Sequence, residues 1–352
     1  MKKYSIIAPT SMGVRITPVD RQPVATSNMF RMQATSAESN VLSISAGLGK
    51  PTKVLTTFVE GSPVATFIKG DLRRRGIDYE GKDVPQGNPW GYRHQFNIAD
   101  SGYGMRAPRV TNDRAGEVGK TLNVADFDLE RIFGEEGCEI LHLSGLICAL
   151  SPETSNFCLQ LARTAKKYGT QISFDLNYRA SFWKGREKEL SAIFSEIAII
   201  SDILVGNEED FQLCLGIKGP EAGGKDIAAK IEGFKGMVKN VKKLYPNATT
   251  FATTLRQVVS ANEHLWGAIV LSCNTWTVIE PRPIPVLDRI GGGDGFVGGL
   301  LYGIAQGWDS EKCAQFGWAS GALVTTLLDD FGLPADEKQI WDIWAGNARV
   351  QR

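Results

Sequence analysis

Histidine is scarce in this chain, and the few histidines present do not group. Only three occur in 352 residues, and no metal-ligand spacing joins them, so a structural zinc site is not expected. The six cysteines form no Cys-x-x-Cys pair, which favours reduced thiols over a disulfide framework. The 39 basic and 39 acidic residues balance, so the charge gives no case for nucleic acid or an anionic membrane as a partner.

Long apolar runs are also missing. No run approaches the roughly 20 residues of a membrane span, and residues 1–9 lack the apolar stretch of a signal peptide. We therefore expect a cytoplasmic protein that binds neither nucleic acid nor a membrane. The length suits one large domain, or one domain with a small lobe.

Glycine, by contrast, is concentrated at one informative place. Gly291, Gly292 and Gly293 precede Asp294 and a helix pattern of small and apolar residues. Glycines let backbone N–H groups approach a ligand closely, and the unpaired N–H groups of a helix start favour an anion. A carboxylate there would repel a resting phosphate, but it can take a proton from a hydroxyl that attacks a phosphoryl group. This combination predicts a small-molecule kinase with Asp294 as the general base.

Another interpretation of the glycine-rich stretch stays open beside this one. A glycine-rich helix start can also serve close packing against a neighbouring segment. The spacing of Gly293, Gly295 and Gly298 satisfies the dinucleotide-binding fingerprint as well. We set that second match aside, because too little chain follows to complete a nucleotide-binding half.

The rest of the chain alternates between strand and helix patterns. Short apolar runs at 139–143 and 172–176 predict strands, and the intervening and following segments at 151–168 and 187–199 have helical periodicity. A further helix pattern covers 224–244. This rhythm predicts a doubly wound α/β fold, with a mostly parallel sheet flanked by helices.

One segment interrupts that rhythm. Residues 81–115 are rich in glycine, proline and aromatics, and we expect them to form most of a small β lid. A contribution to the lid from 8–18 is also expected, within a single domain of residues 1–352. Thr35-x-x-Glu38 is predicted to be a capping box that opens a helix.

Two segments carry longer motifs, namely Asp288-x-x-Gly291-Gly292-Gly293-Asp294-x-x-x-Gly298-Gly299-Leu300-Leu301 and Asp175-Leu176-Asn177-Tyr178-Arg179. The first resembles the C-terminal signature of the PfkB (ribokinase-like) sugar kinases, and the second resembles a segment of their 2-keto-3-deoxygluconate kinase branch. This likeness extends over most of the chain and implies a ribokinase-like fold, an acid sugar as substrate, and ATP and Mg²⁺ as cofactors.

The resemblance also implies which residues bind the sugar. In this branch the arginine that matches Arg179 contacts the acid sugar, and residues 112–116 resemble a substrate segment in which Asn112 replaces an aromatic residue. Guanidinium groups bind carboxylates through two parallel hydrogen bonds, which suits such a role. The expected substrate-binding residues are Ser36, Asn40, Arg93, Asn112, Arg114 and Arg179.

Two further segments correspond to nucleotide-binding parts of the family. Asn207 begins a match to the family's Asn-x-x-Glu motif, with Asp210 in place of the glutamate, although these residues by themselves favour an ordinary helix cap. Asp210 could still act on Mg²⁺ through water, because this ion commonly keeps several waters. Thr254 and Arg256 match the nucleotide strand, where the usual glycines are missing. We expect Asn207, Thr254 and Arg256 to bind the nucleotide.

The predicted reaction is ATP-dependent phosphorylation of 2-keto-3-deoxygluconate at its terminal hydroxyl. In it, the backbone of Gly291, Gly292 and Gly293 stabilises charge on the transferring phosphoryl group. A neutral ketose such as fructose is an alternative substrate. A catalytically silent sugar- or nucleotide-binding regulator is the alternative from another class, and the presence of Asp294 argues against it. We also consider that the protein forms a homo-oligomer through the lid.

Overall fold

The computed structural model describes residues 2–88, 90–219 and 227–350. Its centre is a nine-stranded sheet in the order β15-β14-β13-β12-β11-β10-β1-β4-β6. Between β13 and β6 every pair of neighbouring strands is parallel, whereas the pairs β13–β14 and β14–β15 are antiparallel. The strands are β1 (Tyr4–Pro9), β4 (Thr52–Leu55), β6 (Ile77–Glu80), β10 (Cys138–Ser144), β11 (Gln171–Asp175), β12 (Ile203–Val205), β13 (Thr250–Ser260), β14 (Glu263–Ser272) and β15 (Thr275–Pro285).

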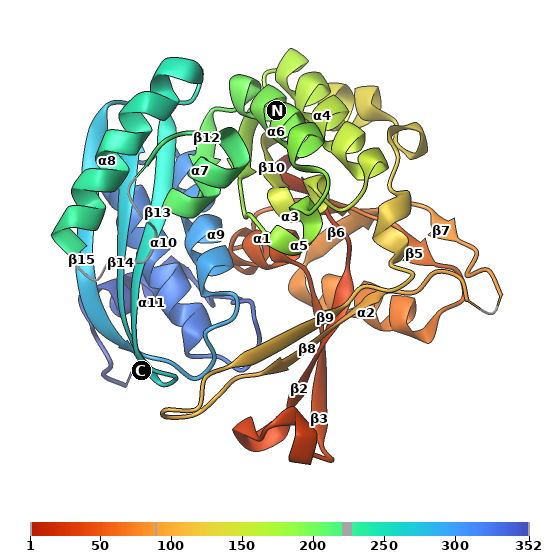
Figure 1. The fold of residues 1–352 in the computed structure, drawn as a ribbon, viewed down its shortest axis with the longest axis horizontal. Helices are drawn as coiled ribbons and strands as arrows, with labels where there is room; N and C mark the ends of the chain where they lie inside the picture. The colour runs from red at the N-terminus through yellow and green to blue at the C-terminus, as the bar shows by residue number, and fades with distance from the viewer. Residues whose placement is uncertain (1, 89, 220–226, 351–352) are drawn as a thin grey trace.

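Helices cover both faces of this sheet (Figure 1). Side chains alternate along each strand, so Ile7 and Leu141 enter one hydrophobic core while Ile6 and Ile140 enter the other. The first core is closed by α3 (Gly145–Cys148), α4 (Pro152–Lys167), α5 (Ala180–Trp183), α6 (Glu187–Ile200), α7 (Glu208–Leu215) and α8 (Ile227–Leu244). The second is closed by α1 (Ala37–Gly47), α2 (Pro63–Arg75), α9 (Gly292–Ala305), α10 (Ser310–Thr325) and α11 (Glu337–Ala345).

The doubly wound, mostly parallel sheet predicted from the sequence is therefore confirmed. The helix expected over 224–244 is α8, and the first three residues of that range lie outside the described part of the chain. Within the described residues, no helix combines the length and apolar character needed to cross a membrane.

A second sheet of four strands projects from one end of the molecule (Figure 1). It has the order β3-β2-β8-β9 and takes strands from both stretches expected to form the lid. The sequence did not predict β3, which forms one edge of this sheet. The strands are β2 (Gly13–Pro18), β3 (Phe30–Thr35), β8 (Gln95–Asp100) and β9 (Arg109–Asp113). A separate pair is formed by β5 (Phe58–Val59) and β7 (Asp83–Val84).

The start of α1 corrects one prediction. Thr35 is the last residue of β3, and the cap is Ser36, whose hydroxyl accepts a hydrogen bond from the Ser39 N–H. Glu38 does not reach back as a capping box requires, because its Oε2 accepts a hydrogen bond from Thr10 Oγ1 at 2.6 Å.

Candidate active site

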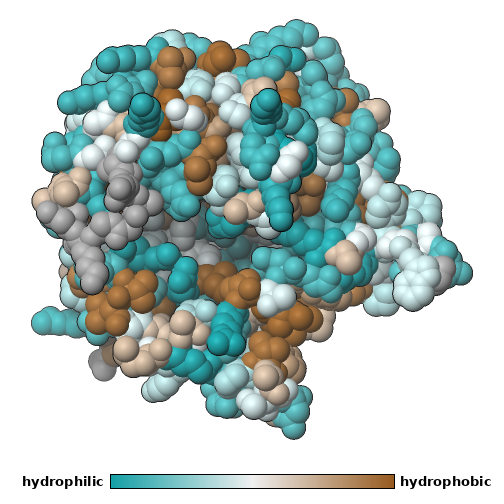
Figure 2. Space-filling model, viewed as in Figure 1, coloured by the Kyte–Doolittle hydropathy of each residue, from teal (hydrophilic) through white to brown (hydrophobic). Residues whose placement is uncertain are grey.

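A cleft of about 830 Å³ opens beside the carboxyl ends of β11 and β12 and the start of α9. Ligands of open α/β sheets commonly bind at such strand ends. Figure 2 shows this face hollowed near its centre, with hydrophilic residues on much of the rim. The residues predicted from the sequence that line the cleft are Arg179, Asn207, Asp210, Thr254, Arg256, Gly293 and Asp294.

The glycine run shapes the start of α9. Gly291 has a φ of +84°, and a Cβ at this position would lie 1.8 Å from the Asp330 carbonyl oxygen, so only glycine fits. The first helical hydrogen bond runs from the Gly295 N–H to the Gly291 carbonyl at 2.8 Å. The N–H groups of Gly292 and Gly293 precede it, so the helix itself offers them no acceptor. A Cβ on Gly293 would meet nothing within 4 Å, and an anion could therefore approach it.

The glycines that follow serve packing instead. A Cβ on Gly298 would lie 2.5 Å from the Val41 carbonyl oxygen, and one on Gly299 would lie 2.4 Å from Ser320 Oγ. These contacts bring α9 close to α1 and α10. The packing interpretation therefore holds for Gly298 and Gly299, and the anion-binding role of the preceding glycines stays a prediction.

Asp294 is half-buried in the first turn of α9. Its Oδ2 accepts a hydrogen bond from Asn40 Nδ2 of α1 at 2.9 Å. Burial raises the pKa of Asp294 well above its usual range, and this hydrogen bond opposes the rise. Three other carboxylates raise the pKa further: Asp330, Asp175 and Glu38.

Arg179 lies at the cleft after β11, where its backbone caps the short helix α5. It is exposed, and its Nη1 donates to the Tyr178 carbonyl at 2.6 Å. Nearby, burial and the charge of Asp210 raise the pKa of Asp175 to about 7. An exposed guanidinium beside a cleft can receive an anionic group of a ligand.

Asn207 and Asp210 form a reciprocal cap at the start of α7. Asp210 accepts hydrogen bonds from the N–H groups of Asn207, at 2.8 Å, and Tyr178, at 2.9 Å, while Asn207 accepts from the Asp210 N–H. Each Asp210 oxygen therefore accepts one backbone hydrogen bond and retains a second lone pair. Thr254 and Arg256 lie on β13, across the cleft mouth, and Arg256 is exposed.

Comparison with known proteins gives this arrangement a context. Residues 123–329 match the pfkB family of carbohydrate kinases. The chain belongs to this family. The kinase assignment made from the glycine-rich stretch is therefore confirmed, together with the ribokinase-like fold.

Individual relatives of this pfkB kinase cover nearly its whole length. The crystal structure of 2-dehydro-3-deoxygluconokinase from Thermotoga maritima has a TM-score of 0.86 and 27% identity, over 98% of this chain and 99% of that one. The 2-dehydro-3-deoxygluconokinase of Bacillus subtilis is 28% identical, over 88% of this chain and 86% of its own. The 5-dehydro-2-deoxygluconokinase of Clostridium perfringens is 24% identical, over 92% and 87%.

Five of the six predicted substrate residues of this pfkB kinase are not part of the cleft lining, although Asn40 among them contacts Asp294. Arg93 pairs with Asp113 in the second sheet, where Asn112 also lies. Arg114 donates from Nη1 to both oxygens of buried Glu117, at 2.8 and 3.0 Å. Ser36 is buried as the cap of α1. Their substrate contacts stay predictions, whereas the structure does bring Asn40, Arg179 and Asp294 to one region.

A buried ion pair in this pfkB kinase was not predicted from the sequence. Arg15 of β2 pairs with Asp288, three residues before Gly291, and both side chains are fully buried. Asp288 also accepts hydrogen bonds from Ser101 Oγ, at 2.6 Å, and the Ile290 N–H, at 3.0 Å. The signal was a charged residue between Val14 and Ile16 in an otherwise apolar strand. The pair joins the second sheet to the glycine run.

Proposed function

We propose that this kinase uses ATP to phosphorylate 2-keto-3-deoxygluconate at its terminal hydroxyl, giving 2-keto-3-deoxy-6-phosphogluconate. One observation carries the proposal. A hydrogen bond from Asn40 orients the Asp294 carboxylate in the first turn of α9, and Asp294 lines the same cleft as the exposed guanidinium of Arg179.

Asp294 would act on the reacting hydroxyl. Its oxygen that does not accept from Asn40 would take the hydroxyl proton as the sugar oxygen bonds to the γ-phosphorus of ATP, the bond from that phosphorus to the bridging oxygen breaks, and ADP leaves. The N–H groups at the start of α9, which begins with Gly292 and Gly293, would stabilise the charge that develops on the phosphoryl oxygens. Gly293, which follows the left-handed turn at Gly291, lines the cleft.

The nucleotide would lie on the β12–β13 side of the cleft, with Asn207, Thr254 and Arg256 around it. Magnesium would neutralise charge on the phosphates. In the described residues, no group of three or more carboxylate, histidine or cysteine side chains could hold a metal alone. This fits an ion bound mainly by phosphates and water, with Asp210 acting through water.

The carboxylate of the sugar would bind Arg179. Three related proteins are named as kinases of keto-deoxy sugar acids, which is consistent with an anionic substrate here. Arg114 would join Arg179 only if it exchanged part of its pairing with Glu117.

A coupled ADP-release assay over a sugar panel tests the proposal. The panel contains 2-keto-3-deoxygluconate, 2-keto-3-deoxygalactonate, 5-keto-2-deoxygluconate and fructose. We expect the highest kcat/KM on 2-keto-3-deoxygluconate, with the phosphate located on the terminal carbon by ³¹P–¹H NMR. A preference for fructose would contradict the acid-sugar assignment. Binding of sugar or ATP without turnover would support the silent regulator.

Two further parts of the proposal concern the protein in its cell. A cytoplasmic location fits six free thiols, five of which are buried. A homo-oligomer formed through the four-stranded sheet is supported by Met29, Phe30 and Met32, which are exposed at or beside its edge strand β3. Light scattering over a range of protein concentrations would detect it.

A further inference from the structure

The amide of Asn40 stands between two charged groups. Its Nδ2 donates to Asp294 Oδ2 at 2.9 Å, and its Oδ1 faces Nη1 of Arg75 at 3.5 Å. A guanidinium only donates hydrogen bonds, and an ionised carboxylate only accepts them. The two neighbours therefore demand the same orientation of the amide, with its oxygen towards Arg75 and its nitrogen towards Asp294.

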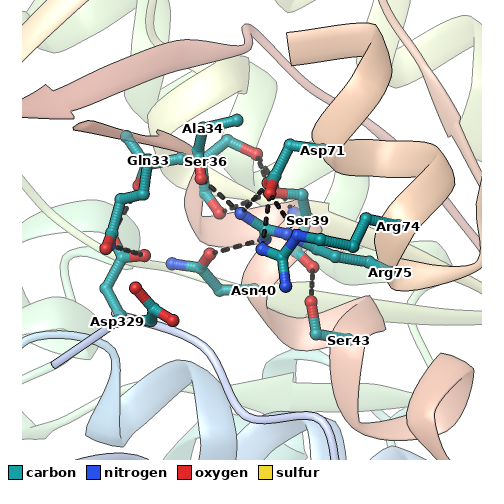
Figure 3. A network of polar contacts seen from close by, with 12 residues as sticks. Gln33, Ala34, Ser36, Ser39, Asn40, Ser43, Asp71, Arg74, Arg75 and Asp329 are labelled. Atoms are coloured by element: carbon teal, nitrogen blue, oxygen red, sulfur yellow. Dashed lines mark hydrogen bonds and ion pairs between the residues drawn. The ribbon is translucent and has the colours of Figure 1, made fainter. Parts of the chain in front are cut away.

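Arg75 is itself held firmly at the end of α2 (Figure 3). It is 2% exposed and pairs with Asp71 at 2.6 Å. Its Nη2 also donates to the Ala34 carbonyl, and its guanidinium carbon lies 3.3 Å from the ring centroid of Phe331. Groups from α2, β3 and the segment after α10 thus fix its position.

The two preceding arginines show that this burial is selective. Arg73 and Arg74 are exposed on the same helix turn. Arg73 donates to the Tyr79 hydroxyl, and Arg74 pairs with Asp71 at 2.6 Å. Of these three consecutive arginines, Arg75 is the one that contacts Asn40.

We propose that Arg75 is a positioning residue for phosphoryl transfer: it orients the Asn40 amide so that this amide donates a hydrogen bond to Asp294. The inference rests on the role of Asp294 in the proposed function. Arg75 touches neither the sugar nor the nucleotide in this scheme, and it acts only through Asn40.

The proposal has a consequence for the pH dependence of the rate. A donor to Asp294 favours its ionised form, which is the form that accepts a proton. The carboxylates that face Asp294 from other segments favour the protonated form: Glu38 of α1, Asp175 at the end of β11 and Asp330 after α10. Without Arg75 the amide can also turn its oxygen towards protonated Asp294 and accept a hydrogen bond from it, which favours the form that cannot accept a proton.

The test compares kcat–pH profiles with 2-keto-3-deoxygluconate and saturating ATP. Arg75→Met should move the acidic limb of the profile to higher pH by about one pH unit. Activity at low pH should then fall roughly tenfold, and most of it should return at high pH. Arg74→Met is the matched control and should follow the parent. Asn40→Ala should shift the limb like Arg75→Met, and the double variant should shift no further.

Several outcomes would overturn the inference. An acidic limb in Arg75→Met that coincides with the parent would show that Arg75 only supports folding. Effects of Asn40→Ala and Arg75→Met that add in the double variant would exclude an action through Asn40. If Arg75→Met does not fold, Arg75→Lys takes its place. Lysine can still donate but lacks the fork, so a limb between those of the parent and Asn40→Ala is required.

Asp294→Asn separates this inference from the proposed function. Loss of turnover in that variant, together with an unshifted limb in Arg75→Met, would overturn the Arg75 inference alone. Normal turnover in Asp294→Asn would overturn both, because no base would remain for Asn40 and Arg75 to position.

Discussion

The polar groups of the cleft are held in two opposite ways. Asp294 forms a hydrogen bond with Asn40, and Asn40 is backed by the buried guanidinium of Arg75. In contrast, Arg179 and Arg256 are exposed, and neither forms an ion pair within the part of the chain that the structure describes. The proposed base is thus oriented in advance, and the proposed anion-binding groups are left unpaired.

The difference follows from what each group must do. A base needs a fixed position near the reacting hydroxyl, because small displacements lower the rate steeply. A guanidinium already paired with a carboxylate would have to break that pair before it could bind a ligand. Arg114 illustrates the second case, since Glu117 occupies its Nη1.

The largest expected effect comes from removing Asp294, the proposed base. Asp294→Asn should lower kcat by about 10²-fold or more, because only the proton acceptor is lost. Thermal unfolding should stay close to that of the parent, and ATP binding by calorimetry should persist. Near-normal turnover would remove Asp294 from the mechanism, and its fixed orientation would then have no catalytic meaning.

The second prediction concerns Arg179, one of the two exposed arginines without an ion pair. Arg179→Ala should lose roughly ten- to a hundredfold in kcat/KM on 2-keto-3-deoxygluconate, since a charge-assisted contact contributes about 1.5–3 kcal/mol. Steady-state kinetics should show the loss mostly in KM. Arg179→Lys should recover part of it, because a point charge lacks the fork. An equal loss on fructose would mean that the arginine does not read the carboxylate.

The third prediction tests whether Asp210 acts on magnesium beside the nucleotide. Asp210→Asn should raise the Mg²⁺ concentration for half-maximal rate by about tenfold, if the carboxylate acts on metal-bound water. The matched variant is Asn207→Ala, which removes the other half of the same helix cap. A parent-like Mg²⁺ titration in both variants would leave the pair as a cap only.

The smallest expected effect concerns stability. Burial and Asp210 raise the pKa of Asp175 to about 7, so the folded state binds this proton more tightly than the unfolded state. The resulting stability declines as the pH rises from about 4 to 7. Asp175→Asn should therefore raise Tm by about 2–4 °C at pH 8 and give no gain at pH 4. Calorimetric scans at the two pH values check this, and an equal change at both would exclude Asp175 titration as the cause.

The glycine run and the strand–helix rhythm could be interpreted from the sequence because both are local patterns. The turn at Gly291 and the apolar strands depend mainly on neighbouring residues. The edge strand β3 could not be found this way, since its pairing with β2 is what makes it a strand. The cap at Ser36 was misplaced by one residue for a similar reason, because Thr10 engages the acid at position 38.

Arg75 shows a different limit. In the sequence it is one of three consecutive arginines near a helix end, where basic residues are common. Only the tertiary packing of α2 against α1 and Phe331 distinguishes it from Arg73 and Arg74. Arg93 and Arg114 show the same limit for predicted substrate residues, because the sequence could not show that nearby acidic residues pair with them.

The buried pair of Arg15 and Asp288 limits how this protein can be recombined. A chimera that received the four-stranded sheet of a relative without the arginine would keep a buried carboxylate without its partner. That loss costs about 3–5 kcal/mol, a large fraction of the stability of a domain. The sheet and the glycine turn would therefore have to be exchanged as one unit, although Arg15 and Asp288 are 273 residues apart in the chain.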